Sequence, residues 1–170
     1  MLGLPKGRVF LVPWDKEWKN EYNTEKEKIL EKIGAYVVSC HHIGSTAVKD
    51  LHSKPIIDIA IEINQYDDGF NCIDNLSTIG YKHRILTELP DRHYFSKGEP
   101  RTHQIHMYQI GSIYLRKQIV FRDCLIKNDT LRDEYQKIKE KYAKEHSADK
   151  LSYADAKSEF INSILKEYDL

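Results

Sequence analysis

The most constraining feature of this sequence is a predicted buried strand that contains the carboxylate of Asp58. Residues Ile56–Ile63 form an almost unbroken apolar segment rich in β-branched side chains, which is typical of a central strand. Because side chains alternate along a strand, Asp58 shares one face with Ala60 and Glu62. A carboxylate inside a core strand is costly unless it is ion-paired, hydrogen-bonded or bound to a metal. Asp58 is therefore the first candidate for a functional residue.

A glycine–serine turn precedes this strand. The apolar run Val37–Cys40 predicts a short strand, and Gly44 and Ser45 follow it within four residues. Glycine lets the backbone approach a ligand closely, and Ser45 is placed to cap a short helix over Thr46–Leu51. The start of such a helix attracts anions, phosphate above all. We therefore predict that Gly44, Ser45 and Thr46 contact a phosphate group.

Several motifs closely resemble those of the GrpB family, also called UPF0157, which is assigned to the nucleotidyltransferase superfamily. The signature is carried by His42–Val48 followed by Lys54–Ile59. Further motifs follow the family's order over nearly the whole chain, which makes the resemblance specific. They are Val12-Pro13-Trp14 with Trp18, Thr102-His103-Gln104-Ile105-His106, Phe121-Arg122-Asp123 with Leu125, and Tyr153 with Lys157, Phe160 and Ile161.

The resemblance implies an α+β fold, with a nucleotidyltransferase-like mixed β-sheet flanked by helices and a C-terminal helical subregion. The hydrophobic periodicity predicts the same order of elements. With neither an internal repeat nor a low-complexity linker, we expect residues 1–170 to form a single domain. The predicted elements are a helix capped by Asp15 and stopped by Gly34, a helix over Asp67–Ile79 with Phe70 inward, strands Tyr81–Leu86, Arg92–Ser96 and His103–Ile110, and three helices capped by Ser112, Asp129 and Ser152.

Composition narrows the class of partner. Lys plus Arg and Asp plus Glu number 26 each, so the chain lacks the basic bias that non-specific nucleic-acid binding uses. Cys40, Cys72 and Cys124 are odd in number and widely spaced, which argues against a disulfide framework and indicates a reducing compartment. No apolar run approaches the ~20 residues that span a bilayer. We therefore expect a cytoplasmic protein without a membrane partner or a strong nucleic-acid signal; the oligomeric state stays open.

Nucleotidyl transfer ordinarily uses carboxylates that hold one or two divalent ions against the triphosphate. The resemblance implies that Asp58 is the first of these acids and the catalytic residue, but Ala60 stands where the superfamily has the second. Glu62 lies roughly 13 Å along the strand from Asp58, at about 3.3 Å per residue, so it does not replace the missing acid.

Histidines are the candidates for the missing ligands of a divalent ion, which we expect to be Mg, Mn or Zn. His106 resembles the superfamily's third acid position, and His42 and His103 are close to Asp58 in the motif pattern. Neutral imidazole suits zinc or iron better than magnesium. The alternative is that these histidines only form hydrogen bonds in the core or at the cleft edge. His103 and His106 differ by three residues and face opposite sides of a regular strand, so both cannot join one cluster unless the strand begins after His103.

Lys54 and Arg122 are cationic candidates for phosphate contacts, Arg through a bidentate fork and Lys as a point charge. Arg122 has a rival role, an ion pair with Asp123 or another helix acid, which is common on helices. The family usually has a further basic residue where this chain has Ile126, which weakens the prediction of a strong anion groove on this helix. Lys157 resembles a family-typical lysine that reaches the cleft, although a solvated face is the default for a lone lysine.

The leading hypothesis is a nucleotidyltransferase-fold protein that binds a nucleotide or another phosphorylated small molecule at Gly44-Ser45, with Asp58 and His106 holding a divalent ion. Transfer of a nucleotidyl group is the reaction that the resemblance implies. Some family members are fused to dephospho-coenzyme A kinase, which implies a coenzyme A-like ligand. Two alternatives remain open: a non-catalytic ligand-binding or regulatory module, which Ala60 favours, and a His/Asp metal-dependent hydrolase, which needs three converging protein ligands.

Overall fold

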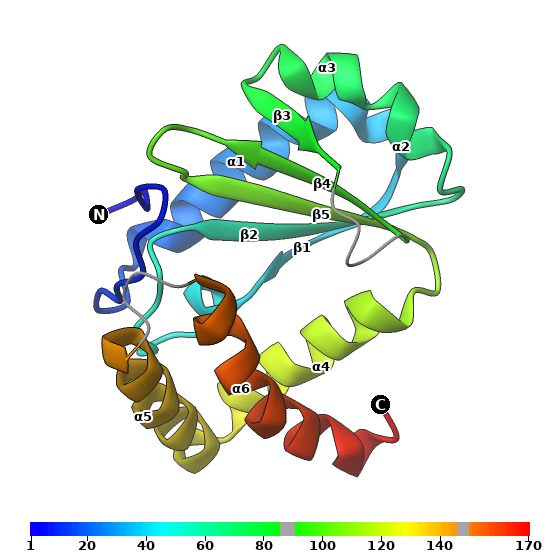
Figure 1. Ribbon diagram of the computed structural model, residues 1–170. Helices are drawn as coiled ribbons and strands as arrows, with labels where there is room; N and C mark the ends of the chain where they lie inside the picture. Colours follow the sequence, from blue (N-terminus) through cyan, green and yellow to red (C-terminus); the bar gives the residue numbers. More distant parts are fainter. Residues whose placement is uncertain (86–90, 146–149) are drawn as a thin grey trace.

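A mixed β-sheet organises the protein. The computed structural model describes residues 1–85, 91–145 and 150–170, and the side chains of residues 150–156 lie outside this description. The sheet has five strands in the order β1-β2-β5-β4-β3 (Figure 1). β2 and β5 run parallel, and the other neighbouring pairs are antiparallel. The strands are β1 (Val37–Ile43), β2 (Ile57–Ile63), β3 (Tyr81–Arg84), β4 (Arg92–Lys97) and β5 (His103–Gln109).

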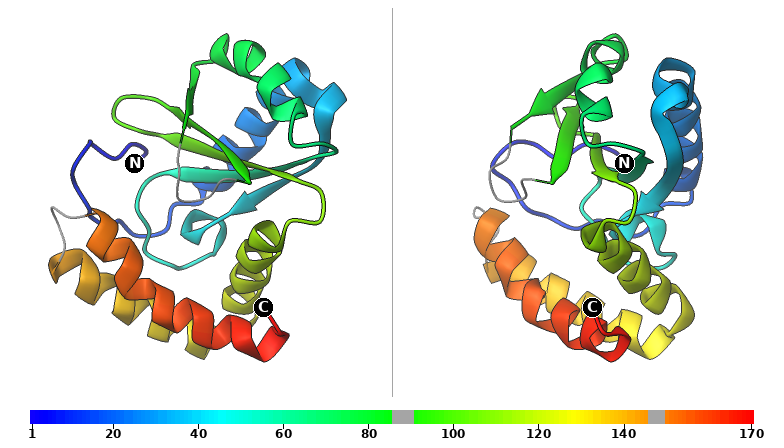
Figure 2. Two further views of the ribbon diagram at one scale, coloured as in Figure 1. Left: turned by 45° about the vertical axis from the view of Figure 1, so that its right-hand side comes forward. Right: turned by 90° about the vertical axis from the view of Figure 1, so that its right-hand side faces the viewer.

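Helices lie on two sides of the sheet, which confirms the predicted α+β fold with a C-terminal helical subregion. α1 and α3 pack on one face, and α4, α5 and α6 gather together beside the other (Figures 1 and 2). None of the described helices is both long and apolar enough to cross a membrane. The helices are α1 (Glu17–Ile33), α2 (Asp68–Asn71), α3 (Ile73–Ser77), α4 (Ile113–Lys127), α5 (Asp129–Glu145) and α6 (Lys150–Leu165), with 3₁₀ turns η1 (Gly34–Tyr36), η2 (Ser45–Ala47) and η3 (Lys166–Tyr168).

The two faces of β2 differ as the alternation of its side chains predicts. Its four isoleucines are fully buried in the core that α1 and α3 cover, where they meet Trp18 and Ile29. Ala60 lies on the opposite face, fully buried in a smaller cluster with Ile43, Tyr108 and Leu115 of α4. The core therefore fixes β2 from one side and leaves Asp58 on the side of the C-terminal helices.

Some predicted boundaries were wrong. The helix expected over Asp67–Ile79 is divided at Cys72 into α2 and α3. Phe70, predicted to face inward, is 52% exposed and packs edge-on against the rings of Tyr66 and His93. A Cβ on Gly69 would lie 2.3 Å from the His93 ring, so the chain passes this ring too closely for a regular amphipathic helix to turn Phe70 inward.

The predicted caps also need correction. The N-cap position of α1 is Lys16, one residue after Asp15, but the Asp15 carboxylate does cap the helix by accepting a hydrogen bond from the Glu17 N–H at 3.1 Å. Asn128, rather than Asp129, accepts the hydrogen bond from the Leu131 N–H at the start of α5, at 3.0 Å. α6 already begins at Lys150, and the side chains of the predicted cap Ser152 and of Tyr153 lie outside those described. Leu86, the predicted end of a strand, also lies outside the described residues.

Candidate functional site

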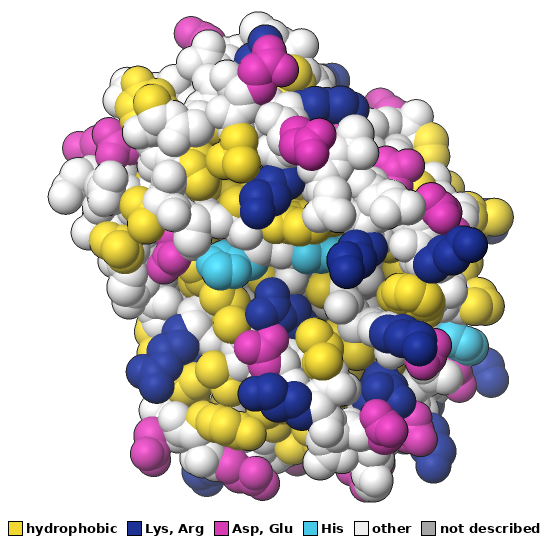
Figure 3. Space-filling model, turned by 180° about the vertical axis from the view of Figure 1, so that it is seen from behind, with side chains coloured by type: hydrophobic (Ala, Val, Ile, Leu, Met, Phe, Trp, Pro, Cys, Tyr) yellow, Lys and Arg dark blue, Asp and Glu magenta, His cyan; other side chains and the backbone are white. Residues whose placement is uncertain are grey.

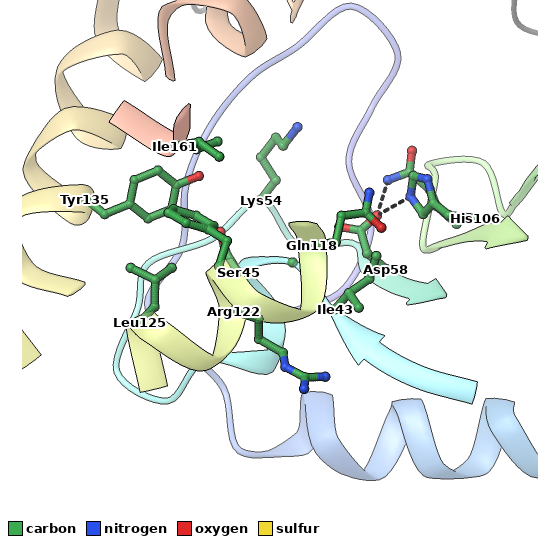
Figure 4. Close-up of a pocket in the computed structure, with 13 residues that line it drawn as sticks. Ile43, Ser45, Lys54, Asp58, His106, Gln118, Arg122, Leu125, Tyr135 and Ile161 are labelled. Carbon is green, nitrogen blue, oxygen red and sulfur yellow. Dashed lines mark hydrogen bonds and ion pairs between the residues drawn. The ribbon is translucent and has the colours of Figure 1, made fainter. Parts of the chain in front are cut away.

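Asp58 lies at the centre of the polar face of the sheet. Its side chain is 26% exposed, so the carboxylate is open to a cavity and not sealed in the core. Because β2 and β5 pair in parallel with Asp58 opposite Gln104, the Gln104 Nε2 donates a 2.6 Å hydrogen bond to Asp58 Oδ1. His106, two residues further along β5, brings its Nε2 to 3.4 Å from the same oxygen (Figure 4).

Asp58 stays ionised despite its burial. Burial raises the pKa of the Asp58 carboxyl, but hydrogen bonds from His106 and Gln104 and the positive charge of Lys54 outweigh burial. The pKa of Asp58 therefore lies below its ordinary value. The site presents an anion whose Oδ1 is already hydrogen-bonded.

Two arginines orient the groups that hold Asp58. Arg101 Nη1 donates to Gln104 Oε1 at 3.2 Å, so the amide nitrogen of Gln104 must face the carboxylate. Arg92 Nη1 lies 2.9 Å from His106 Nδ1. A guanidinium only donates, so Nδ1 accepts and His106 carries its hydrogen on Nε2, toward Asp58. His106 is thus a hydrogen-bond donor to Asp58 with both ring nitrogens engaged.

The glycine–serine turn packs directly on this carboxylate. Gly44 has φ 69° and ψ −173°, a backbone conformation that is essentially restricted to glycine. A Cβ at Gly44 would lie 2.8 Å from Asp58 Oδ2. The following residues form only the 3₁₀ turn η2, because the chain becomes extended again at Val48; the predicted helix over Thr46–Leu51 is absent from this described segment. Close approach at Gly44, and not a helix start, brings the turn to Asp58.

These groups border a cavity of about 280 Å³ between the sheet and the C-terminal helices (Figure 4). One side of the cavity is polar, with Lys54 standing between the Asp58 group and the helices. The other side is apolar. The described lining residues are Ile43, Gly44, Ser45, Lys54, Asp58, Gln104, His106, Gln118, Phe121, Arg122, Leu125, Tyr135 and Ile161.

Three lysines from different elements, the half-buried Lys54 and Lys157 and the buried Lys139, lie close enough for their charges to act on one another. Lys157 precedes the lining residue Ile161 by one helical turn and therefore lies on the same face of α6. Burial and the charge of Lys54 lower the pKa of Lys157 to about 7, although Asp58 acts in the opposite direction. Burial also lowers the pKa of Lys54, and that of Lys139, which donates to the backbone oxygen of His52. The site thus brings lysines from several elements close to the carboxylate of Asp58.

His42 and Thr46, predicted for this site, lie on the other face of the sheet. His42 Nε2 is 3.0 Å from Thr46 Oγ1, and the His42 ring stacks on Tyr22 of α1 at 4.7 Å. Burial lowers the pKa of His42 to about 4. Both residues line a separate cavity of about 450 Å³ next to α1. From behind, His side chains bordered by Lys and Arg lie across the junction between the sheet and the C-terminal helices (Figure 3).

His103 is likewise separated from Asp58, as the three-residue spacing to His106 predicts. It is 5% exposed and its Nδ1 lies 2.9 Å from Thr102 Oγ1. Burial lowers the pKa of His103 to about 4, against the opposing charge of Glu25 on α1. The predicted gathering of His42 and His103 around Asp58 is therefore corrected: alternation along β1 and β5 directs both side chains toward α1.

Arg122 adopts the rival role considered for it. Its Nε donates to Asp123 Oδ1 at 2.8 Å and its Nη1 to the His42 backbone oxygen at 2.8 Å. Its guanidinium points away from Asp58 and Lys54 (Figure 4). Arg122 therefore links α4 to β1, and its positive charge is already neutralised.

The residues around Asp58 do not form a histidine–aspartate metal centre. Within the described part of the chain, no three His, Cys, Asp or Glu side chains come together as metal ligands. Ala60 fills the second acid position with a buried methyl group, and Glu62 accepts a hydrogen bond from Ser39 on β1. His106 directs an N–H at Asp58, so neither of its nitrogens has a lone pair free. The hydrolase alternative thus lacks its ligand set in the described residues.

Sequence reasoning overlooked three residues of the site: Gln104, Tyr135 and Lys139. Gln104 was detectable, because it lies two residues before His106 and therefore on the same strand face. Tyr135, whose hydroxyl is hydrogen-bonded with Ser45, was assigned to an apolar helix stripe. Lys139 lies one turn after Tyr135 and carries no sequence signal that separates it from the solvated lysines around it.

Comparison with solved structures identifies the class of fold. The chain resembles the Cid1 poly(U) polymerase with MgGTP bound, with a TM-score of 0.55 and 12% identity over 79% of this chain and 44% of the Cid1 chain. It resembles the crystal structure of the conserved protein GrpB from Enterococcus faecalis much more closely, with a TM-score of 0.86 and 27% identity over 93% of this chain and 96% of that one. The fold is nucleotidyltransferase-like.

The family follows from the sequence. The family described as "GrpB protein" matches residues 8–167, and the chain belongs to the GrpB family. It is 32% identical to glutamate-rich protein GrpB of Alkalihalophilus pseudofirmus over 98% of this chain and 99% of that protein. It is 30% identical to the UPF0157 protein YqkA of Bacillus subtilis over 94% of this chain, but it spans only 47% of YqkA.

The contact between Gly44 and Asp58 yields a stability prediction. Gly44→Ala should lower the free energy of unfolding by about 2 kcal/mol or more, because the backbone conformation is strained and the new methyl group meets Asp58. Gly111→Ala is the matched control: it also has a positive φ, but its Cβ meets nothing within 4 Å, so about 1 kcal/mol is expected. Urea unfolding measures both; equal losses would mean that Gly44 does not press on Asp58.

Proposed function

We propose that this protein binds the phosphate groups of a nucleotide or another phosphorylated small molecule in the Asp58 cavity. The observation that carries the proposal is that the half-buried Lys54 and Lys157 lie close to the carboxylate of Asp58, which with Lys54 lines the cavity. Burying a cation is costly unless a negative charge accompanies it. The charge of Asp58 acts on both Lys54 and Lys157. A phosphate group in the cavity would place its negatively charged oxygens beside these ammonium groups.

The shape of the cavity supports a ligand with a phosphate end and an organic end. Small-molecule pockets commonly measure ~300–1,000 Å³, and the cavity's volume of about 280 Å³ suits a phosphate group with an adjoining sugar better than a whole dinucleotide. Phe121, Leu125 and Ile161 form the apolar wall opposite Asp58. A nucleotide or a coenzyme A-like molecule would place only its phosphorylated end here.

Nucleotidyl transfer is the second candidate function. It is favoured by the nucleotidyltransferase-like fold and by the open carboxylate on β2. It is weakened by Ala60, which leaves Asp58 without a second acid two residues along the strand. Magnesium ions are commonly bound by one or two carboxylates together with substrate phosphates. We therefore infer that a divalent ion would bind here only together with a phosphorylated ligand, with Asp58 as its protein ligand.

The pKa of Lys157 predicts how binding depends on pH. Lys157, with a pKa of about 7, attracts phosphate only while it is protonated. The affinity for ADP should therefore fall at least about tenfold from pH 7 to pH 9, where the phosphate charge no longer changes. Lys157→Arg, which stays charged, should lose clearly less affinity for ADP between pH 7 and pH 9 than the wild type does.

The matched control is Lys166→Arg, an exposed lysine beyond the end of the same helix, which should keep the wild-type pH dependence. Calorimetric titration measures all three proteins. A wild-type affinity that does not change between pH 7 and pH 9 contradicts the role of Lys157.

The role of a divalent ion gives a separate prediction. Magnesium should strengthen ADP binding by the wild type about tenfold, and Asp58→Asn should remove this gain, because the ion loses its protein carboxylate. Glu62→Gln is the control, since Glu62 is on the same strand face but is hydrogen-bonded to Ser39. Equal ADP binding by the wild type in magnesium and in chelator would remove nucleotidyl transfer from consideration and leave a binding module.

A further inference from the structure

A second cavity, of about 570 Å³, lies on the other side of the Asp58 network and is strongly basic. Its walls are the N-terminal segment, the end of β3 and the turn between β4 and β5. The N-terminal segment is fixed in place by paired backbone hydrogen bonds of 2.9 and 3.1 Å between Leu4 and Arg101 (Figure 1). The charged residues among the described lining are Lys6, Arg8, Arg84, Arg101 and the single acid Glu99.

Some of the cations elsewhere in the protein are neutralised by ion pairs. Lys28, Lys97, Arg122 and Arg132 each form an ion pair with a carboxylate. Among the side chains that the structure describes, none of the four basic residues of the second cavity forms an ion pair. The chain has equal numbers of basic and acidic residues, so this local surplus is not a consequence of overall charge.

Hydrogen bonds connect the second cavity to Asp58. Arg101 lines the cavity and donates to Gln104 Oε1 at 3.2 Å, while Gln104 Nε2 donates to Asp58 at 2.6 Å. Tyr94 donates to the same Gln104 oxygen and lies among Arg84, Arg92 and Arg101, whose charges oppose the effect of burial on its pKa. The second cavity is thus two hydrogen bonds away from the carboxylate of the first site.

We propose that the second cavity binds a second small molecule that carries at least two phosphate-like negative charges. Guanidinium groups pair with phosphate oxygens in a bidentate manner. Several such cations in one cavity match a ligand with two negative charges better than a ligand with a single carboxylate. Buried Leu4 and Ile56 contribute apolar surface to the lining, which suits an attached organic group. If this second molecule acts together with the ligand of the Asp58 cavity, that joint role rests on the proposed function. The presence of an anion site in the second cavity does not rest on it.

Inorganic pyrophosphate is the probe for this site. Calorimetric titration of the wild type should show two binding events. The double variant Arg8→Gln/Arg84→Gln should lose one of them, with affinity at that site at least tenfold weaker, and Lys54→Gln should lose the other. Arg116→Gln, an exposed arginine of α4 that lines neither cavity, is the matched control and should bind like the wild type.

The single variant Arg8→Gln controls for misfolding of the double variant, because Arg8 is exposed and its replacement should leave the fold intact. It should weaken the pyrophosphate binding event that the double variant loses. Pyrophosphate binding that is unchanged in both arginine variants overturns the second site, as does the complete absence of pyrophosphate binding by the wild type. One event that only Lys54→Gln removes also overturns the second site but leaves the proposed function intact. One event that only the arginine variants remove supports the second site and contradicts the proposed function.

Discussion

The hydrogen bonds from Gln104 and His106 to Asp58 are the interactions on which the candidate site depends. Without them, burial on β2 would favour the neutral acid or expel the side chain. With them, the carboxylate stays ionised and shares one oxygen with two donors, while its other oxygen faces Gly44. The fixed negative charge then permits Lys54 and Lys157 to lie nearby in a largely desolvated place. Arg92 and Arg101 complete the arrangement, since each orients one donor from behind.

The two faces of the sheet differ in the charge of their polar groups. On the α1 face, His42 and His103 are buried, with pKa values lowered to about 4, so both are neutral at pH 7. On the opposite face, Lys54 lies beside Asp58 in the first cavity, and four basic residues against one acid are among the described lining of the arginine-lined cavity. A protein whose overall charge is balanced therefore concentrates positive charge at one place. That distribution favours recognition of small phosphorylated molecules over general attraction to nucleic acid.

Much of the fold and of the candidate site could be predicted from the sequence, because alternation along β2 and the family motifs are local signals. The orientation of Asp58, the proximity of Gly44 and the separation of His103 from His106 all follow from strand periodicity and motif order. The rest depends on tertiary contacts. The pairing of β2 with β5 places Gln104 opposite Asp58, and the packing of α6 brings Lys157 to the cavity. The ion pair of Arg122 with its neighbour Asp123 was foreseen as an alternative, yet only the structure decides it. The prediction that Phe70 faces inward was wrong because Gly69 lies against His93, which is in a strand more than twenty residues away in the sequence.

The central claim is that the Asp58 cavity receives the phosphate groups of the ligand. A crystal structure of the protein grown with a nucleoside triphosphate tests this most directly. We expect phosphate oxygens within hydrogen-bonding distance of the Lys54 and Lys157 ammonium groups, with the chain of phosphates running past Gly44 and Ser45. A nucleotide bound instead in the cavity beside α1, with His42 and Tyr22 at its base and no phosphate near Lys54, would contradict the claim.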